Sequence, residues 1–380
     1  MKIKNKSKFG FLFGSGISIP AKMDSTTTLT EKVLLAEGMT NISSAYLHVN
    51  NPSEFSWNPK NEYISRIKLL FSLIKEYLGT HYSFSNRELN YEDYYYIIDS
   101  MHQDENMNLE NPIVTFFNDY LVKNNPQLFH PIDKYYSNIR LIELCSEAKN
   151  YIKDVVTSNL NTAPSTLIHL TFLKEACKEN YDTKNYVFTL NHDTILEQFF
   201  DKNELKYSDG FNAQQDGLKI WNKDNFTENL ILLKLHGSVN WFRLEGKTWY
   251  DEQIIIPNTL IRGLGRPILL IGSFNKIYQY NRGISFELQC LFAKYLDHVQ
   301  TLIVSGYSFG DQGVNNRLID WIYKCSKHRL IVVHPDADNL GKFARPAIAG
   351  KWKMWLNEGI LSIIPKYIEE LTWTDIRGYL

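Results

Sequence analysis

The sequence has little cysteine and no long apolar run, and each shortage excludes a class of protein. Only four of its 380 residues are cysteine, and no two form a C-x-x-C pair, which excludes a four-cysteine zinc site and a disulfide framework. No apolar stretch approaches the roughly 18 residues that a membrane helix needs. The apolar run after the basic N-terminus is too short, and too interrupted by glycine, for a signal peptide. We therefore expect a soluble protein of a reducing compartment, the cytoplasm.

An excess of charge of one sign is also absent. Lys and Arg number 41 and Asp and Glu number 42, which gives a formal net charge of −1. This balance provides no overall basic field for holding nucleic acid nonspecifically, so nucleic acid is not indicated as a partner. The hydrophobic share of 44% is typical of globular proteins. The length suits one large domain with an insertion, or two domains.

Short apolar runs that end in small or polar residues predict buried parallel strands. Helix-like amphipathic stretches lie between several of them, and strands that alternate with helices favour a doubly wound α/β sheet. The expected strands are residues 9–13, 186–190, 230–235, 267–271, 301–304 and 330–333, and the expected helices between them are 193–200, 285–296 and 314–323.

One long stretch has a different pattern. Residues 29–173 contain amphipathic segments such as 63–78 and 94–101, with loops rich in Asn and Pro and no clear buried-strand run. We predict that this stretch is a mostly helical insertion. The sheet domain is then discontinuous and comprises residues 1–28 and 174–380.

The first expected strand leads into a glycine loop, which reads Gly14-Ser15-Gly16-Ile17-Ser18. Small residues there allow the backbone to approach a phosphate and to donate its N–H groups. The dehydrogenase fingerprint needs a third glycine where Ile19 stands, so a hydride-transfer enzyme is disfavoured. A tight turn that simply requires glycine explains the same pattern equally well.

Two polar turns follow the next strands. Asn191-His192-Asp193 precedes a helix, and His236-Gly237-Ser238 ends the following strand. If the strands are adjacent and parallel, both turns open on the same edge as the glycine loop. Asn191 then orients a hydroxyl or a water, and His236 accepts a proton near neutral pH. Alternatively, Asn191 caps the helix, His236 is a hydrogen-bonded buried histidine, and His192 is a packing or surface residue.

In combination these motifs resemble those of the sirtuins. The glycine loop is similar to the G-A-G-I-S loop, residues 189–193 to T-Q-N-I-D, residues 235–237 to L-H-G, and residues 305–308 to the G-T-S segment that contacts ribose and phosphate. The order and the strand contexts agree. The resemblance implies a Rossmann-like doubly wound sheet that binds NAD.

The sequence differs from the sirtuin deacylases in one region, and this difference indicates which sirtuin-like group it resembles. Sirtuin deacylases carry two cysteine pairs for zinc after the histidine, and here that stretch reads Val239-Asn240-Trp241-Phe242-Arg243. Three segments more closely resemble sirtuin-type domains of bacterial anti-phage defence systems: the Asn-His-Asp turn at 191–193, His-Gly-Ser-Val-Asn-Trp at 236–241 and Gly-Tyr-Ser-Phe-Gly-Asp at 306–311. That resemblance implies an NAD hydrolase, without zinc, which releases nicotinamide and ADP-ribose and depletes NAD. It also implies a homo-oligomer, a partner protein such as a HerA-type hexameric ATPase, or both.

The resemblance assigns roles to further residues. Asp193 holds the nicotinamide amide or orders the pocket. The remaining binding positions, on the phosphate and adenosine side, are Gly14, Ser15, Gly16, Ser18, Gly306, Ser308, Phe309 and His334. Three other functions stay open: a catalytically silent NAD or ADP-ribose sensor that serves as a scaffold, a protein deacylase, and a nuclease that uses the carboxylates at strand ends, Asp193, Asp311 and Asp336.

Overall fold

The computed structural model describes residues 7–35, 38–42, 44–50, 54, 58–82, 88–131, 138–213, 217–244, 253–257, 264–273 and 275–380. The chain divides into two compact units. The larger unit comprises Met1–Ser25, Leu160–Leu270 and Lys276–Leu380, and the smaller comprises Thr26–Asn159 and Ile271–Asn275. None of the described helices is long and apolar enough to cross a membrane.

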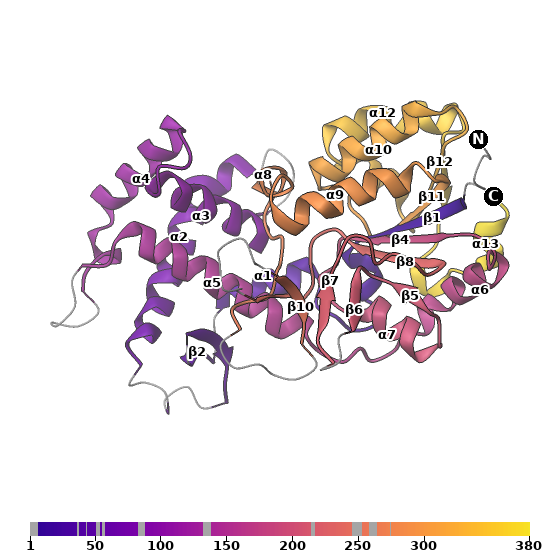
Figure 1. The fold of residues 1–380 in the computed structure, drawn as a ribbon. Helices are drawn as coiled ribbons and strands as arrows, with labels where there is room; N and C mark the ends of the chain where they lie inside the picture. Colours follow the sequence, from indigo (N-terminus) through magenta and orange to yellow (C-terminus); the bar gives the residue numbers. More distant parts are fainter. Residues whose placement is uncertain are drawn as a thin grey trace. The chain divides into compact units, whose positions relative to one another are not determined.

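The larger unit is built on a parallel sheet of seven strands in the order β13-β12-β11-β1-β4-β8-β5 (Figure 1). On one side of β1 lie β4, β8 and, at the edge, β5, which precedes β8 in the chain; on the other side lie β11, β12 and β13 in chain order. Because strands are added on both sides of β1, the sheet is doubly wound. The expected α/β fold class is therefore confirmed. The strands are β1 (Ser7–Phe13), β4 (Asn185–Thr189), β5 (Tyr207–Ser208), β8 (Leu230–Lys234), β11 (Val299–Ser305), β12 (Arg329–Val333) and β13 (Leu361–Ile364).

Helices cover both faces of this sheet (Figure 1). Successive side chains of β1 point to opposite faces: Leu12 joins the core beneath α9, α10 and α12, while Phe11 packs against Phe172 of α6. The helices of this unit are α6 (Thr171–Glu179), α7 (Ile195–Lys202), α8 (Asn275–Gln279), α9 (Gly283–Leu296), α10 (Gln312–Lys324), α11 (Ala337–Phe343), α12 (Pro346–Asn357) and α13 (Trp373–Arg377).

Three features of the larger unit differ from the expectation. The expected strand at 267–271 is wrong, because it makes only an isolated antiparallel bridge between Leu269 and Gly237. Strands β5 and β13 were not expected, since both are short and lack a long apolar run. A second, antiparallel sheet was not expected either. It has the order β6-β7-β10-β9 and consists of β6 (Phe211–Ala213), β7 (Lys219–Trp221), β9 (Phe242–Leu244) and β10 (Gln253–Ile256).

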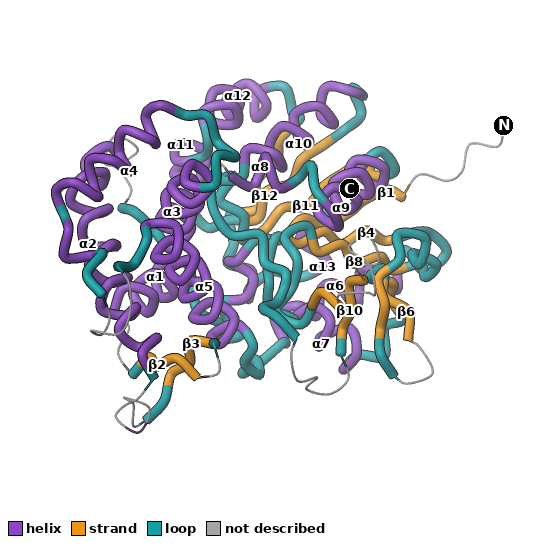
Figure 2. Tube along the Cα trace, turned by 60° about the vertical axis from the view of Figure 1, so that its left-hand side comes forward, coloured by secondary structure: helices purple, strands orange, loops and turns teal. Residues whose placement is uncertain are grey.

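The smaller unit is mainly helical, with one hairpin of β2 (Met39–Ile42) and β3 (Ala45–His48). Figure 2 shows its helices gathered in one bundle. They are α1 (Thr26–Leu35), α2 (Glu62–Tyr82), α3 (Tyr91–Glu105), α4 (Pro112–Asn124) and α5 (Leu141–Leu160). The range expected for the insertion, 29–173, overlaps this unit, although α6 begins within that range and belongs to the larger unit.

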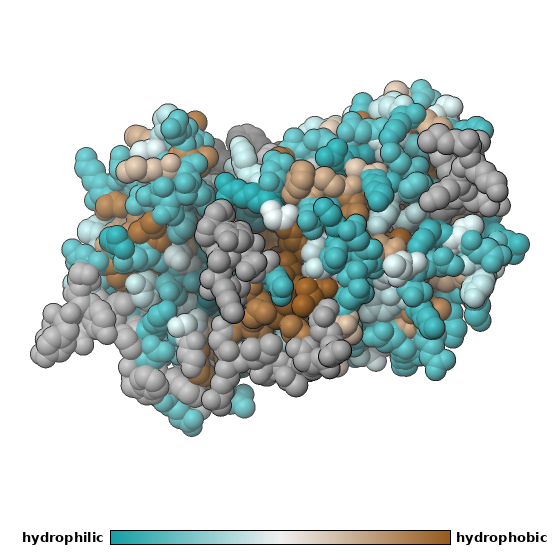
Figure 3. Space-filling model, viewed as in Figure 1, coloured by the Kyte–Doolittle hydropathy of each residue, from teal (hydrophilic) through white to brown (hydrophobic). Residues whose placement is uncertain are grey.

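On the face drawn in Figure 3, most of the coloured surface is hydrophilic. Apolar side chains are interspersed among hydrophilic ones on the smaller unit. On α4, Ile113 is 78% exposed and Phe116 is 72% exposed. Single exposed apolar residues are common on soluble proteins and by themselves indicate no partner.

Candidate functional site

Four loops follow neighbouring parallel strands at the same edge of the larger unit's sheet. Strand β1 pairs with both β11 and β4, and β4 pairs with β8. The loops after these strands begin at Gly14, Gly306, Leu190 and Leu235. In open α/β sheets the carboxyl ends of strands at the reversal of strand order, here between β1 and β11, form the usual ligand crevice.

The glycine loop and the loop after β11 pack directly on each other. The N–H of Gly14 donates to the Ser305 carbonyl at 3.1 Å, and the N–H of Gly16 donates to the Gly306 carbonyl at 3.0 Å. A Cβ on Gly16 would lie 2.6 Å from the Gly306 Cα, and Gly306 itself has a φ of +67°. These glycines therefore serve a close loop–loop contact. Two of the amides expected to face phosphate already have protein partners, whereas Ser15 is exposed.

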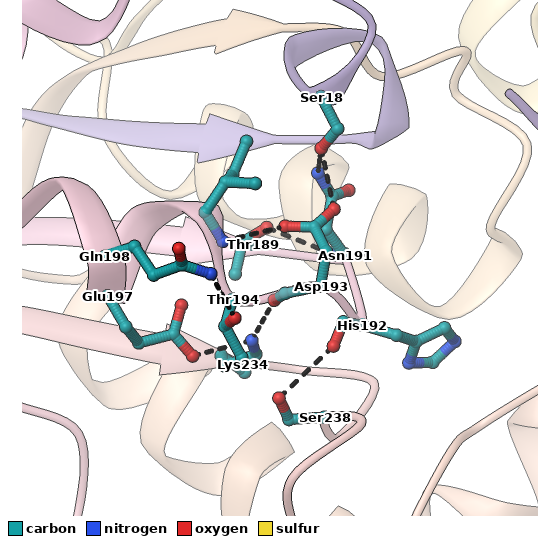
Figure 4. A network of polar contacts seen from close by, with 11 residues as sticks. Ser18, Thr189, Asn191, His192, Asp193, Thr194, Glu197, Gln198, Lys234 and Ser238 are labelled. Atoms are coloured by element: carbon teal, nitrogen blue, oxygen red, sulfur yellow. Dashed lines mark hydrogen bonds and ion pairs between the residues drawn. The ribbon is translucent and has the colours of Figure 1, made fainter. Parts of the chain in front are cut away.

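Asn191, Ser18 and Asp193 form one chain of hydrogen bonds (Figure 4). The Asn191 Nδ2 donates to Ser18 Oγ at 2.9 Å, and that hydroxyl donates to Asp193 Oδ2 at 2.7 Å. The other carboxylate oxygen of Asp193 accepts from the N–H of Ile195 at 3.2 Å, at the start of α7. Asp193, not Asn191, is thus the side chain that accepts from the first backbone N–H of α7, whose N-cap position is Thr194. The amide of Asn191 is directed at the glycine loop.

A buried ion pair between Lys234 and Glu197 supports the backbone of the 191–193 turn (Figure 4). Lys234, the last residue of β8, is only 1% exposed. Its ammonium donates to the Asp193 carbonyl and contacts Glu197 Oε1 at 2.7 Å. Burial raises the pKa of Glu197, and the neighbouring Lys234 opposes that rise. The sequence analysis did not anticipate this pair, because a lysine at the end of an apolar strand carries no pattern of its own.

Removal of the Lys234 charge should destabilise the fold strongly. We expect Lys234→Met to lower the free energy of unfolding by about 3–5 kcal/mol, because it leaves a buried carboxylate and a carbonyl unpaired. The double variant Lys234→Met/Glu197→Leu should recover part of that loss. The measurement is urea unfolding followed by circular dichroism.

The matched control is an exposed pair, Lys324 and Asp297 at 2.5 Å, whose side chains are 59% and 44% exposed. Lys324→Met should change the free energy of unfolding by less than about 1 kcal/mol. Equal effects at Lys234 and Lys324 would contradict the structural role given to the buried pair.

His236, in the loop after β8, contacts two polar side chains, Tyr280 and Asp311. Its Nε2 lies 2.8 Å from the Tyr280 hydroxyl and 3.1 Å from Asp311 Oδ2, and the Tyr280 hydroxyl donates to the same carboxylate oxygen at 2.6 Å. The neighbouring segment braces this turn, since Leu270 N–H donates to the His236 carbonyl at 2.9 Å. At Gly237 φ is +79°, and a Cβ there would lie 2.1 Å from the Ile268 carbonyl oxygen.

The two neighbouring histidines have different electrostatic surroundings. Burial holds the pKa of His192 well below its usual range, and the basic groups of His236, Lys276 and Lys234 nearby lower it further, so its ring is neutral. Burial alone would raise the pKa of Asp311, but the hydrogen bond and charge of His236 outweigh it and lower that pKa. His236 therefore faces an ionised carboxylate. His192 occupies a buried packing position, as one sequence interpretation expected.

The two expected binding residues of the loop after β11, Ser308 and Phe309, differ in their exposure to solvent. Ser308 is exposed, but the Phe309 ring is fully buried and packs 4.9 Å from Tyr307 and 5.6 Å from Trp352, centroid to centroid. Phe309 is thus a core residue, and its backbone carbonyl already accepts from Asn315 Nδ2 at 2.8 Å. His334, after β12, is half-buried and accepts from the Asp336 N–H at 3.0 Å.

Two partners of His236 escaped the sequence analysis. Asp311 was considered only among strand-end carboxylates for a nuclease, and Tyr280 was not singled out. Among the described residues, no group of three or more His, Cys, Asp or Glu side chains could hold a metal ion.

The inner site residues are nearly inaccessible in this conformation. Ser18 is 3% exposed, His236 is 4%, Asp193 is 5% and Asn191 is 6%. Low exposure strengthens their hydrogen bonds, because little water competes for the same groups.

We compared the chain with curated proteins and with solved structures. No curated protein matches the chain. Solved structures that match include a Sir2 homologue mutant in complex with ADP-ribose (9% identity, TM-score 0.41, covering 98% of this chain and 92% of that one) and a Sir2 homologue in complex with NAD (11%, 0.41, 98% and 90%). These TM-scores are too low to establish a shared fold.

A protein-family model gives a more specific match. The family described as SIR2-like domain matches residues 185–356. This range begins at β4, includes the turns that carry Asn191 and His236 and the loop that carries Asp311, and ends within α12; the glycine loop lies outside it. From β4 to α12, the chain therefore contains a region similar to the SIR2-like domain family.

Proposed function

We propose that this protein hydrolyses NAD at the nicotinamide–ribose bond and releases nicotinamide and ADP-ribose. The observation that carries the proposal is that loops at the same sheet edge supply two buried side chains: Asn191, whose amide donates to Ser18 of the glycine loop, and His236, which faces the Asp311 carboxylate. Cleavage breaks the C1′–N bond and develops oxocarbenium character on the ribose. Water supplies the new C1′–O bond and loses one proton.

Each residue of the pair has a separate task in this proposal. Asn191 positions the water or the ribose hydroxyls near C1′, through a carboxamide that both donates and accepts. His236 takes up the proton as general base. Asp193 holds the nicotinamide amide or orders the pocket through Ser18. The phosphate and adenosine portions contact Gly14, Ser15, Gly16, Ser18, Gly306, Ser308, Phe309 and His334.

The proposal extends to the biological setting. Residues 1–28 and 174–380 form the NAD-binding domain, and residues 29–173 form a helical insertion that serves assembly. In the cytoplasm the enzyme depletes NAD as an anti-phage abortive-infection effector. An enzyme that destroys NAD must be restrained, by homo-oligomerisation, by a partner such as a HerA-type hexameric ATPase, or by both. The resemblance of the sequence motifs supports this setting.

One observation favours a second candidate function. The low exposure of Ser18, Asn191, Asp193 and His236 also suits a silent sensor, which binds NAD or ADP-ribose and serves as an assembly scaffold. A sensor needs no base, so the contact between His236 Nε2 and the Asp311 carboxylate, at 3.1 Å, favours the hydrolase.

The test is product analysis with the purified chain. We expect that incubation with NAD, alone or with its native partner, yields nicotinamide and ADP-ribose in equal amounts on chromatography. NAD that stays intact in both arms but raises the melting temperature would overturn the hydrolase in favour of the sensor, because a ligand that binds only the folded state stabilises it.

A further inference from the structure

We propose that Asp311 and Tyr280 are positioning residues for His236: Asp311 fixes the tautomer of the ring and stabilises its protonated form, and Tyr280 moderates that effect by sharing the same carboxylate oxygen. The inference deepens the proposed function and rests on it for its catalytic consequence. The geometry that it explains, three buried polar groups within hydrogen-bond distance of one another, exists whatever the substrate.

Counting protons assigns the tautomer. An ionised carboxylate only accepts hydrogen bonds, and Tyr280 gives its single hydroxyl proton to Asp311 Oδ2 at 2.6 Å. The proton between the His236 ring and this pair must therefore be carried by Nε2, which lies 2.8 Å from the phenol oxygen and 3.1 Å from the carboxylate. In the neutral ring Nδ1 is then the acceptor, and a proton taken from a ligand hydroxyl enters there.

The position of Asp311 is fixed independently of His236. Its second oxygen, Oδ1, caps α10 by accepting from the N–H of Val314 at 3.0 Å. The Tyr307 hydroxyl donates to Asn315 Oδ1 at 2.8 Å and accepts from the Asp311 N–H at 3.2 Å. The carboxylate thus remains in place when the ring changes its charge, which is what an orienting group requires.

The charges around the ring make Asp311 its main stabilising partner. Among the described residues, the groups that act on this cluster include the Tyr280 phenol, His192 on the neighbouring turn, and the Lys276 ammonium, which acts on both His192 and Asp311. His192 is neutral and Lys276 is cationic, so neither favours an imidazolium. Asp311 supplies the one negative charge in this set, and it is ionised because its pKa is lowered.

The two substitutions should act in opposite directions. Asp311→Asn removes the negative charge, so the pKa of His236 should fall by about 1 unit or more. A carboxamide can accept or donate, so the tautomer is no longer imposed. Tyr280→Phe removes a donor that competes for Oδ2, so the carboxylate binds the ring proton more strongly and the pKa of His236 should rise. A role limited to packing predicts neither pattern.

The experiment measures the pKa and the tautomer of His236 directly, so it does not depend on catalytic turnover. The full-length protein is labelled with ¹⁵N-histidine, the His236 resonances are assigned by their loss in His236→Gln, and pKa and tautomer are followed by long-range ¹H–¹⁵N NMR. In parallel, kcat/KM for NAD is measured against pH. The acidic limb should move down for Asp311→Asn, with a plateau about 100-fold lower, and up for Tyr280→Phe.

The matched control is Asp336→Asn. Asp336 also follows a sheet strand and caps a helix, accepting from the Asn339 N–H at 3.2 Å. Asparagine caps as well as aspartate, so both Asn variants should fold. The control should leave the His236 titration unchanged. A His236 pKa that stays unchanged in Asp311→Asn, or that shifts equally in all three variants, overturns the inference. The expected shifts in a protein that leaves NAD intact would uphold the positioning pair and reject the hydrolase.

Discussion

Replacement of His236 by glutamine is expected to lower kcat for NAD hydrolysis by about 100-fold to 10,000-fold, the usual contribution of a general base. Glutamine approximates the size of the imidazole and can still form a hydrogen bond with Tyr280 or Asp311, but it cannot take up a proton. KM for NAD should change less than kcat, because proton transfer matters only in the transition state. The measurement is steady-state kinetics of nicotinamide release.

The neighbouring histidine provides the control for this prediction. His192 lies close by, with its ring centroid 6.2 Å from that of His236, and is just as buried. Its ring is kept neutral, so His192→Gln should retain kcat within a few-fold, provided that its melting temperature shows it is folded. If His192→Gln and His236→Gln lose activity equally, the assignment of the base to His236 is wrong.

Replacement of Asn191 by alanine is expected to lower kcat by about 100-fold to 1,000-fold, by analogy with the loss of one preorganised hydrogen-bonding group from an active site. The amide donates to Ser18 at 2.9 Å in this structure, and its backbone N–H donates to Thr189 Oγ1 at 3.1 Å, so the turn fixes its direction. Asn191→Asp should be similarly impaired, because the new carboxylate loses the donor and lies beside Asp193.

A second asparagine, just after the C-terminal end of α7, tests whether the effect is local. Asn203, at the other end of α7, donates to the Phe199 carbonyl at 2.9 Å and lies outside the site. Asn203→Ala should keep kcat near that of the wild type while lowering stability modestly. An Asn191→Ala enzyme with more than half of the wild-type kcat would refute the positioning role, and retained NAD binding by calorimetry would show that the loss is catalytic.

The central strands were predictable because each is a run of apolar residues that is buried on both faces of a parallel sheet. Strands β1, β4, β8, β11 and β12 all have this property. The same reasoning misassigned residues 267–271, which are apolar because they pack over Gly237 and not because they pair within the sheet. Periodicity alone does not distinguish a buried brace from a buried strand.

The edge strands and the antiparallel sheet could not be predicted from the sequence, because their strands are too short. Strand β5 has two residues and β6, β7 and β9 have three each, which is too short for any pattern to emerge. Their strand conformation depends on hydrogen bonds to partners elsewhere in the chain, such as those between β10 and both β7 and β9.

The sequence by itself determined that polar turns follow buried strands at one edge of a doubly wound sheet, because residue order fixes which end of a parallel strand a turn follows. It thereby predicted that Ser18, Asn191 and His236 belong to one region. Only the tertiary structure decided which atoms meet. The Ser18 hydroxyl bonds a carboxylate 175 residues away, and His236 meets a phenol 44 residues away. Such contacts arise from the packing of loops from separate strands, and no local spacing encodes them. The difference between a histidine that is merely buried and one that faces Asp311 was therefore settled by the fold alone.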